Sequence, residues 1–386
     1  MIARLRHVFL SAFGALTLLA SLNAGALPVL PGAVGYGTNT EAGRDATEGN
    51  IYEVTSLDDS NLANPAIGTL RYGIERVPGP RVIVFRVSGV IELQSDLKVR
   101  VDSGSAVRGF VTIAGQTAPF PGITLKNGGI RVNGHDVLIQ HIGIRPGNFV
   151  KGDEHLPPSQ QVPDGWELSS LNNRDCIRVE GDAVNNVVVD HVTCTWSTDE
   201  TGTTWWGSPQ GTITNVTFAN SIFADPIQFS GHTDAAGNPQ QHGLGVLVGP
   251  GTSNMSIVRN VMAFNWSRNP LVRAKTSGAQ IVNNFIYRPG PFVNGAMYIG
   301  SYGGFDTPSP SDNFPNFPMV VSAIGNVAVR SPALTWHGKN TDAHESGFFV
   351  HQNATSDLSL FLEGNYSYNP DMGVWHPTGS QYSSPF

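Results

Sequence analysis

The stretch Ile257-Val258-Arg259-Asn260-Val261-Met262 contains the unit from which the fold is built: a short apolar strand, a corner with asparagine, and a second apolar strand. Because so short a strand cannot bury its apolar face alone, repetition of this unit predicts successive coils stacked around a continuous core. Similar corners, each an asparagine or aspartate between apolar runs, recur at Asp190, Asn220, Asn284, Asn326 and Asn365.

The corner asparagines favour one solenoid in particular. Stacked asparagines can hydrogen-bond to one another, and asparagine tolerates the left-handed backbone of a corner. Asn260 and Asn284 are 24 residues apart, which suits one coil, whereas the longer intervals suit a coil with a loop or two coils. A β-sandwich also has many short strands, but Asn-Gly and Asp-Gly hairpin turns are scarce here. We therefore predict an all-β fold, a single-stranded right-handed parallel β-helix.

Three stretches interrupt the pattern and are rich in Pro, Gly, Ser or Asp: residues 148–173, 225–242 and 302–318. In a solenoid, loops inserted on one face form a groove, so these segments predict the walls of a binding site. No stretch has the composition of a linker. We expect a single domain over residues 27–386.

The first 26 residues predict an export signal. Arg4 and Arg6 precede an apolar run over residues 8–22, and Ala24-Gly25-Ala26 forms a small-x-small cleavage site. No later segment is apolar enough to span a bilayer. The sequence therefore predicts a secreted protein, extracellular or periplasmic, without a membrane partner.

The charge and the cysteines limit the partners and leave one question open. The formal net charge is −7, which argues against a nucleic-acid partner because phosphate binding requires a basic face. An acidic polysaccharide is also repelled at long range, so its site needs local cations or a bound metal. The two cysteines, Cys176 and Cys194, either pair in an oxidising compartment or remain two buried thiols.

The array Arg268-Asn269-Pro270-Leu271-Val272-Arg273 carries two guanidiniums on either side of a proline that fixes the turn. The planar fork of arginine matches a carboxylate, so two arginines at a strand end suit an anionic ligand such as a uronate sugar. A solvated surface or an ion-pair network is the alternative interpretation of the same pattern.

A series of motifs in order resembles the pectate lyase family, polysaccharide lyase family 1. The likeness covers about residues 34–330, and implies a right-handed β-helix that cleaves polygalacturonate by calcium-assisted β-elimination to 4,5-unsaturated products. Its partner would be an acidic plant cell-wall polysaccharide, and we expect a monomer. The motifs are Gly68-Thr-Leu-Arg71, Val87-Ser-Gly-Val-Ile91, Val111-Thr-Ile-Ala-Gly-Gln-Thr-Ala-Pro119, Asp175-Cys-Ile-Arg-Val-Glu-Gly181, Val187-Val-Val-Asp-His191, Thr195-Trp-Ser-Thr-Asp-Glu200, His242-Gly-Leu-Gly-Val-Leu-Val-Gly249, Arg268 to Arg273 and Val282-Asn-Asn-Phe285.

The resemblance also implies roles for individual residues. By position, Asp175 and Asp199 match calcium ligands, and Glu200 is a substitute for an acid that the family often has nearby. Arg268 falls at the family's proton-abstracting arginine and Arg273 at its substrate-carboxylate arginine. Neutralising an arginine near pH 8 costs roughly 6–8 kcal/mol, which nearby cations and burial reduce.

Some positions depart from the family pattern and keep other functions open. The second acid is replaced by Thr203, the substrate lysine by Leu244, and Trp196, Trp205 and Trp206 make the region aromatic. Such walls suit methylated pectin, and the two replacements suit a non-catalytic carbohydrate-binding β-helix with a decayed site. A hydrolase that uses the acids is a further alternative. The histidines show no metal-ligand spacing, so no role is assigned to His141, His232 or His242.

Overall fold

The computed structural model describes most of the chain. The predicted export signal and most of the predicted loop over residues 302–318 lie outside the described residues, as does much of the loop over 148–173. The described residues are 28–44, 50–100, 109–149, 166–206, 211–233, 236–273, 276–290, 296–300, 318–330, 335–336, 339–340, 348–350, 358–370 and 373–378.

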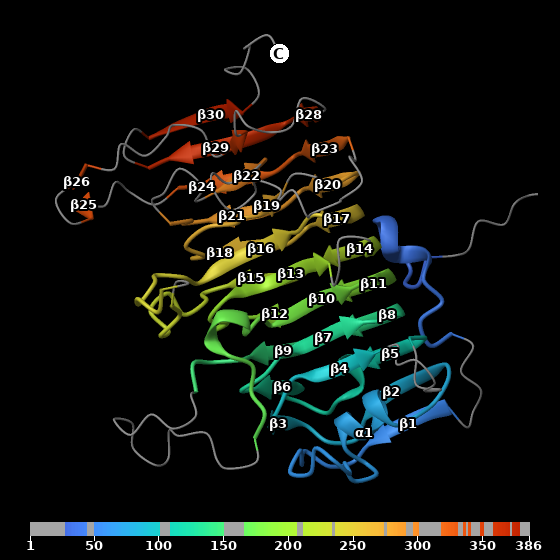
Figure 1. The fold of residues 1–386 in the computed structure, drawn as a ribbon. Coiled ribbons are helices and arrows are strands. Elements are labelled where there is room, and N and C mark those ends of the chain that lie inside the picture. The colour runs from blue at the N-terminus through green and yellow to red at the C-terminus, as the bar shows by residue number, and fades with distance from the viewer. Residues whose placement is uncertain are drawn as a thin grey trace, which may run out of the picture.

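Three long sheets run the length of the molecule, with strands stacked from β1 at one end to β30 at the other (Figure 1). The first sheet consists of β1 (Ile51–Val54), β2 (Arg81–Phe85), β5 (Val111–Ala114), β8 (His135–Gln140), β11 (Ala183–Asp190), β14 (Thr212–Ala219), β17 (Thr252–Val258), β20 (Ala279–Val282), β23 (Met319–Ile324) and β28 (Leu358–Glu363). The second consists of β4 (Leu97–Arg100), β7 (Ile130–Asn133), β10 (Ile177–Gly181), β13 (Glu200–Trp206), β16 (Leu244–Val248), β19 (Leu271–Val272), β22 (Met297–Ile299) and β27 (Phe348–Val350). The third consists of β3 (Gly89–Glu92), β6 (Ile123–Lys126), β9 (Ile142–Arg145), β12 (Thr193–Cys194), β15 (Ile222–Ala224), β18 (Val261–Ala263), β21 (Phe285–Tyr287), β24 (Val327–Val329), β29 (Asn365–Asn369) and β30 (Val374–Thr378).

Each coil contributes one strand to the first sheet, then one to the third and one to the second, as β11, β12 and β13 do. Neighbouring strands within the sheets are parallel, except that β29 and β30 are antiparallel. A separate antiparallel pair joins β25 (Thr335–Trp336) to β26 (Lys339–Asn340). This arrangement is the right-handed parallel β-helix predicted from the sequence, and it excludes the β-sandwich.

One continuous core fills the space between the sheets. Its members come from aligned positions of successive coils, so that each buried side chain stacks on its register partner above and below. This stacking is what the short strands require, because each coil buries its neighbour's apolar face. One such column runs through Ile139, Val189, Phe218, Ile257, Ile281 and Ala323.

A short helix covers the first coils. In α1 (Leu70–Glu75), the side chain of Thr69 accepts a hydrogen bond from the backbone N–H of Tyr72 and so caps the N-terminus. Leu70 and Ile74 are buried in the core, and Figure 1 shows the helix beside β1 and β2. Among the described residues, short helical turns are also found at η1 (Tyr36–Asn39), η3 (Gly115–Thr117) and η5 (Leu171–Asn173). Across the described part of the chain, no helix has the length and apolar character needed to span a membrane.

The predicted asparagine ladder is confirmed over four coils. The Nδ2 of Asn260 donates to Oδ1 of Asn284 at 3.1 Å, Asn284 donates to Asn326 at 2.9 Å, and Asn326 donates to Asn365 at 2.9 Å. Each of the last three residues also donates to a backbone carbonyl of a neighbouring coil, as Asn284 does to Ile257. These side chains are buried, and the ladder supplies their hydrogen bonds.

The prediction for Asp190 and Asn220 was wrong in register. Asn220 has a left-handed backbone, with φ of 50°, and donates to Asp190 Oδ1 at 2.7 Å outside the ladder. Ser221 occupies the ladder position instead, and its backbone N–H donates to Asn260 Oδ1. The hydroxyl of Ser221 accepts from the N–H of Val192, so a small polar side chain satisfies this corner where asparagine does elsewhere.

We expect Asn284→Ala to lower the free energy of unfolding by about 3 kcal/mol. The side chain of Asn284 accepts two hydrogen bonds from Asn260 and donates to Ile257 and Asn326, and its loss leaves buried partners unsatisfied. Denaturant and thermal midpoints measure the change. The control is Asn283→Gly, an exposed neighbour with φ of 54°, where glycine keeps the left-handed backbone. Equal losses for the two variants would contradict the structural role of the ladder.

Candidate functional site

The predicted site residues lie where strands of the second sheet begin. Asp175 precedes β10, Asp199 precedes β13, Glu200 begins β13, and Arg268 precedes β19. The strands β10, β13, β16 and β19 are consecutive neighbours in the sheet, so residues nearly one hundred positions apart in sequence meet at one corner. The register of the coils therefore brings these residues together at one corner.

The three carboxylates form a buried cluster. One oxygen from each of Asp175, Asp199 and Glu200 lies within 4.8 Å of the others. Asp175 Oδ1 accepts from the backbone N–H of Glu200 at 3.0 Å, and its Oδ2 accepts from Arg178 at 3.1 Å. Burial, together with the charge of Asp199, raises the pKa of Asp175 to about 8. The cluster therefore holds more negative charge than its partners neutralise.

Glu200 joins the cluster because the chain turns immediately before β13. Sequence alternation alone would direct adjacent residues of a strand to opposite faces, but Asp199 precedes the first residue of the strand. Glu200 is buried, and its Oε1 accepts a hydrogen bond from Nη1 of Arg268. The ion pair joins the carboxylate cluster to the arginine array two strands away.

The backbone of Arg268 lies very close to Gly245 on β16, in the preceding coil. Gly245 donates its N–H to the carbonyl of Ser267, and a Cβ at Gly245 would stand 2.1 Å from the carbonyl oxygen of Arg268. Only glycine allows this approach. Arg268 itself has φ of 64°, a left-handed conformation that directs the chain out of the corner before β19.

Arg273 lies at the far end of β19, above an aromatic side chain. Its guanidinium is 5.2 Å from the ring centroid of Trp205, which stacks on Trp206 with centroids 4.7 Å apart. Burial and the nearby charge of Arg268 lower the pKa of Arg273 to about 10. The two arginines thus flank β19, while Trp205 and Trp206 form part of the support for Arg273 rather than an isolated platform.

The two departures from the family pattern are buried in the second sheet. Thr203 has no hydrogen-bond partner for its hydroxyl among the residues that the structure describes, and Leu244 pairs in register with Glu200. On the outer side of the sheet, Leu247, Leu271 and Tyr298 form an apolar cluster separate from the core. Trp196, in contrast, is 51% exposed at the corner that leads to Asp199.

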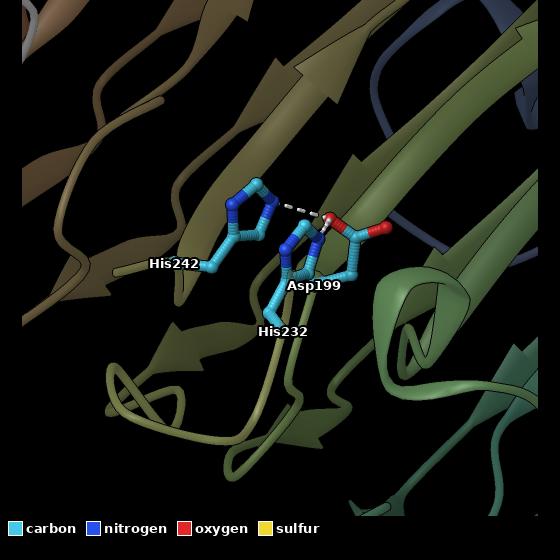
Figure 2. A group of neighbouring side chains, drawn as sticks. All are labelled: Asp199, His232 and His242. Carbon is cyan, nitrogen blue, oxygen red and sulfur yellow. Dashed lines mark hydrogen bonds and ion pairs between the residues drawn. The ribbon is translucent and has the colours of Figure 1, made fainter. Parts of the chain in front are cut away.

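Two histidines that the sequence analysis left without a role contact the cluster. His242 Nε2 lies 2.7 Å from Asp199 Oδ1, and His232 Nε2 lies 4.0 Å from the same oxygen (Figure 2). Both come from the segment between β15 and β16, within the loop predicted at 225–242. Their ten-residue separation in a loop has no helical or strand period, so the sequence carried no signal that they converge.

Cys176 and Cys194 form a disulfide, which resolves the alternative left open by the sequence. The Cα atoms are 5.9 Å apart, and both sulfurs are buried in the core. Cys176 follows Asp175 directly, and Cys194 lies on the strand that leads to Asp199. The bond therefore ties together the two coils that carry these carboxylates.

A polar cleft of about 370 Å³ lies on the same sheet, toward the N-terminal coils. Three cations line it, Lys98, Arg100 and Arg131, from the neighbouring strands β4 and β7. Arg131 is paired with Asp96 at 2.6 Å and with Glu180 at 2.8 Å. The outer surface of the second sheet thus combines basic and acidic groups on the coils that precede Asp175.

The fold and the site define a class of protein: a parallel β-helix with buried carboxylates beside two arginines on one sheet. No family model matches the chain. A protein of Aspergillus flavus named probable pectate lyase C is 32% identical over 80% of this chain and 55% of its own length, and its Aspergillus fumigatus counterpart is 31% identical over 90% and 61%. Pectate lyase 5 of Ambrosia artemisiifolia is 25% identical over 82% and 70%.

Solved structures agree on the fold. A mutant of the Bacillus subtilis pectate lyase superposes with a TM-score of 0.50, at 14% identity, over 89% of this chain and 88% of that one. The chain spans little more than half the length of the Aspergillus flavus relative. The chain is therefore similar in sequence to proteins named pectate lyase and has the β-helix fold of a solved pectate lyase.

Proposed function

We propose that the chain is a secreted polysaccharide lyase that cleaves polygalacturonate by calcium-assisted β-elimination. The observation that carries this proposal is the meeting of Asp175, Asp199 and Glu200 with Arg268 at one corner of the helix. Homology to proteins named pectate lyase supports it. Secretion rests on the predicted signal over residues 1–26, and a monomer acting alone on the polysaccharide is part of the proposal.

The carboxylate cluster fits a calcium ion. Calcium takes six to eight hard oxygen ligands, and Asp175, Asp199 and Glu200 supply carboxylate oxygens in a buried position. Burial, and after it the neighbouring charge of Asp199, raise the pKa of Asp175, and a bound cation would offset both effects. These three residues would hold the ion, which would supply Lewis-acid stabilisation of the uronate carboxylate.

The two arginines divide the remaining chemistry. Arg273 holds the substrate carboxylate, and Arg268 removes the proton on C5, which is weakly acidic because it lies α to that carboxylate. The electron pair left on C5 forms the C4–C5 double bond as the C4–O bond breaks, and the leaving oxygen takes up a proton. Burial and the nearby charge of Arg268 lower the pKa of Arg273 to about 10, so the two guanidiniums interact across β19.

Cations along the second sheet suit an extended anionic chain. The polar cleft on the sheet that carries the carboxylates is lined by Lys98, Arg100 and Arg131, and also by Asp96, Glu167 and Glu180, of which Asp96 and Glu180 pair with Arg131. A protein of net charge −7 needs such local cations to hold a polyuronate. We propose that sugars beyond the cleaved bond bind there.

Cleavage of methylated pectin is the second candidate. Leu247, Leu271 and Tyr298 form an apolar cluster on the outer side of the second sheet, and Thr203 and Leu244 stand where the family pattern has an acid and a lysine. These side chains are themselves buried, so the exposed ring of Trp196 is the apolar group that a substrate with fewer charges would contact.

The test is an assay of the full secreted chain on both substrates. Polygalacturonate with calcium should give a rise in ultraviolet absorbance from the unsaturated product, and a chelator should abolish it. A larger rise with esterified pectin would select the second candidate. New reducing ends without absorbance would identify a hydrolase, and binding without turnover would identify a non-catalytic protein; either result overturns the proposal.

A further inference from the structure

A cluster of one aspartate and two histidines stands beside the three carboxylates. His232 and His242 approach Asp199 from the segment between β15 and β16, and their rings stack with centroids 3.6 Å apart and planes 11° apart (Figure 2). One ligand atom from each of the three residues lies within 4.8 Å of the others. Both rings direct a nitrogen toward the same oxygen of Asp199.

We propose that Asp199, His232 and His242 form a binding site for a transition-metal ion of the zinc class. Such an ion binds histidine nitrogen and aspartate oxygen at about 2.0–2.2 Å, which places the donors about 3.4 Å apart in a tetrahedral arrangement. The observed separations from Asp199 Oδ1 are 2.7 Å to His242 Nε2 and 4.0 Å to His232 Nε2. Small movements of the two rings therefore bring the donors to ligand distance, with a fourth position left for water.

Hydrogen bonding explains only one of the two rings. His242 is satisfied by Asp199, but His232 is 7% exposed, and its Nδ1 has no hydrogen-bond partner among the described residues. Its Nε2 is too far from Asp199 for a hydrogen bond. Burying an imidazole without partners is costly, and stacking on a second imidazole does not replace the lost water contacts. A metal ion shared with His242 and Asp199 would bind Nε2 of this ring and give its approach to Asp199 a partner, while Nδ1 keeps its N–H on the side away from the ion.

The donor chemistry separates this site from a calcium site. Calcium and magnesium select oxygen ligands, whereas imidazole nitrogen suits zinc, cobalt, nickel and copper. Asp175 and Glu200 lie on the oxygen-rich side of Asp199, and the two histidines lie on the nitrogen-rich side. Asp199 belongs to both groups and would bridge two ions of different chemistry.

The chain contains a matched comparison. His141 and His191 also stack, with centroids 4.6 Å apart, and His191 Nδ1 lies 2.7 Å from Asp190 Oδ2. The side chain of His191 is 50% exposed, and Asp190 Oδ2 also accepts from Gln140. Among the described residues this second pair belongs to no group of converging ligand atoms. This pair has the same residue types as the proposed zinc site, but its ligand atoms do not converge in a buried position.

The test uses the full chain freed of metal by a chelator and titrated with zinc in the presence of excess calcium. We expect one zinc ion per chain by calorimetry and metal analysis. We also expect bound cobalt to give the visible spectrum of a site with two nitrogen ligands. His232→Ala and His242→Ala should each weaken zinc binding by about 100-fold or more. His191→Ala and Asp175→Asn should bind zinc as the parent does.

Two results would overturn the proposal. One is zinc binding that is absent from the parent protein, or that His191→Ala and His242→Ala weaken equally. The other is bound zinc that excess calcium displaces. Circular dichroism and the thermal midpoint of each variant establish that it is folded. Because the readout is metal binding, a protein that binds no zinc would overturn the zinc site and leave the proposed lyase activity intact. A protein that binds zinc but has no lyase activity would support the zinc site and overturn the proposed activity.

Discussion

Replacing Arg268 by lysine should reduce kcat on polygalacturonate by about 100- to 10,000-fold, the range typical of a general base. Lysine keeps a positive charge near Glu200 and therefore keeps most of the ion pair that links the carboxylates to the arginine array. It lacks the planar fork and the length to occupy the same position. Initial rates of unsaturated product over a range of pH measure the effect.

The pH dependence distinguishes a base from a fixed charge. The pKa of free lysine is about 10.4, well below that of free arginine, so the residual rate of Arg268→Lys should reach its plateau at lower pH. Arg268→Gln should be inactive at every pH. If Arg268→Lys instead works within a few-fold of the parent while Arg268→Gln fails, charge alone is needed and the assignment of the base is wrong.

A second arginine provides the control for this experiment. Arg86 also pairs with a glutamate, Glu53, but both side chains are exposed. Arg86 directly follows β2 and Glu53 lies on β1, far from the site in the stack of coils. Exposed pairs contribute little to stability. Arg86→Lys should therefore leave both the rate and the thermal midpoint unchanged.

The coil architecture was readable from the sequence because its signals repeat. Short apolar runs and corner asparagines recur from coil to coil, and the ladder of Asn260, Asn284, Asn326 and Asn365 confirms the register that they predict. The prediction failed at Asn220 because this asparagine lies one residue before the ladder position, which Ser221 occupies. Only hydrogen-bond geometry distinguishes an inward corner asparagine from a left-handed one.

The site was readable where its residues begin strands and unreadable where they come from a loop. Asp175, Asp199 and Arg268 precede β10, β13 and β19 of the same sheet, so stacking alone brings them together. Glu200 required knowledge of where the chain turns. His232 and His242 required the path of the segment between β15 and β16, which no periodicity encodes. Long-range convergence of a loop is set by packing against coils already formed, and a single sequence carries little trace of it.

Asp199→Asn should have the broadest effect of any substitution on metal binding. Asparagine preserves the shape and one acceptor oxygen but removes the charge that both ligand groups share. We expect the calcium concentration for half-maximal activity to rise by about 100-fold or more, and zinc binding to disappear. Calorimetry with each metal alone gives the same comparison without the assay.

Variants on either side of Asp199 separate the two effects. Asp175→Asn should weaken calcium binding and spare zinc, since Asp175 lies only in the carboxylate group, whereas His242→Ala should do the reverse. Asp225→Asn, an exposed acid at the next corner of the third sheet, makes the same charge change and should alter neither. Should Asp199→Asn behave like Asp225→Asn, Asp199 would hold no metal, and its contact with His242 would be a hydrogen bond that positions the loop. A loss of zinc binding with an unchanged calcium response would instead assign Asp199 to the histidine group alone and leave Asp175 and Glu200 to hold calcium without it.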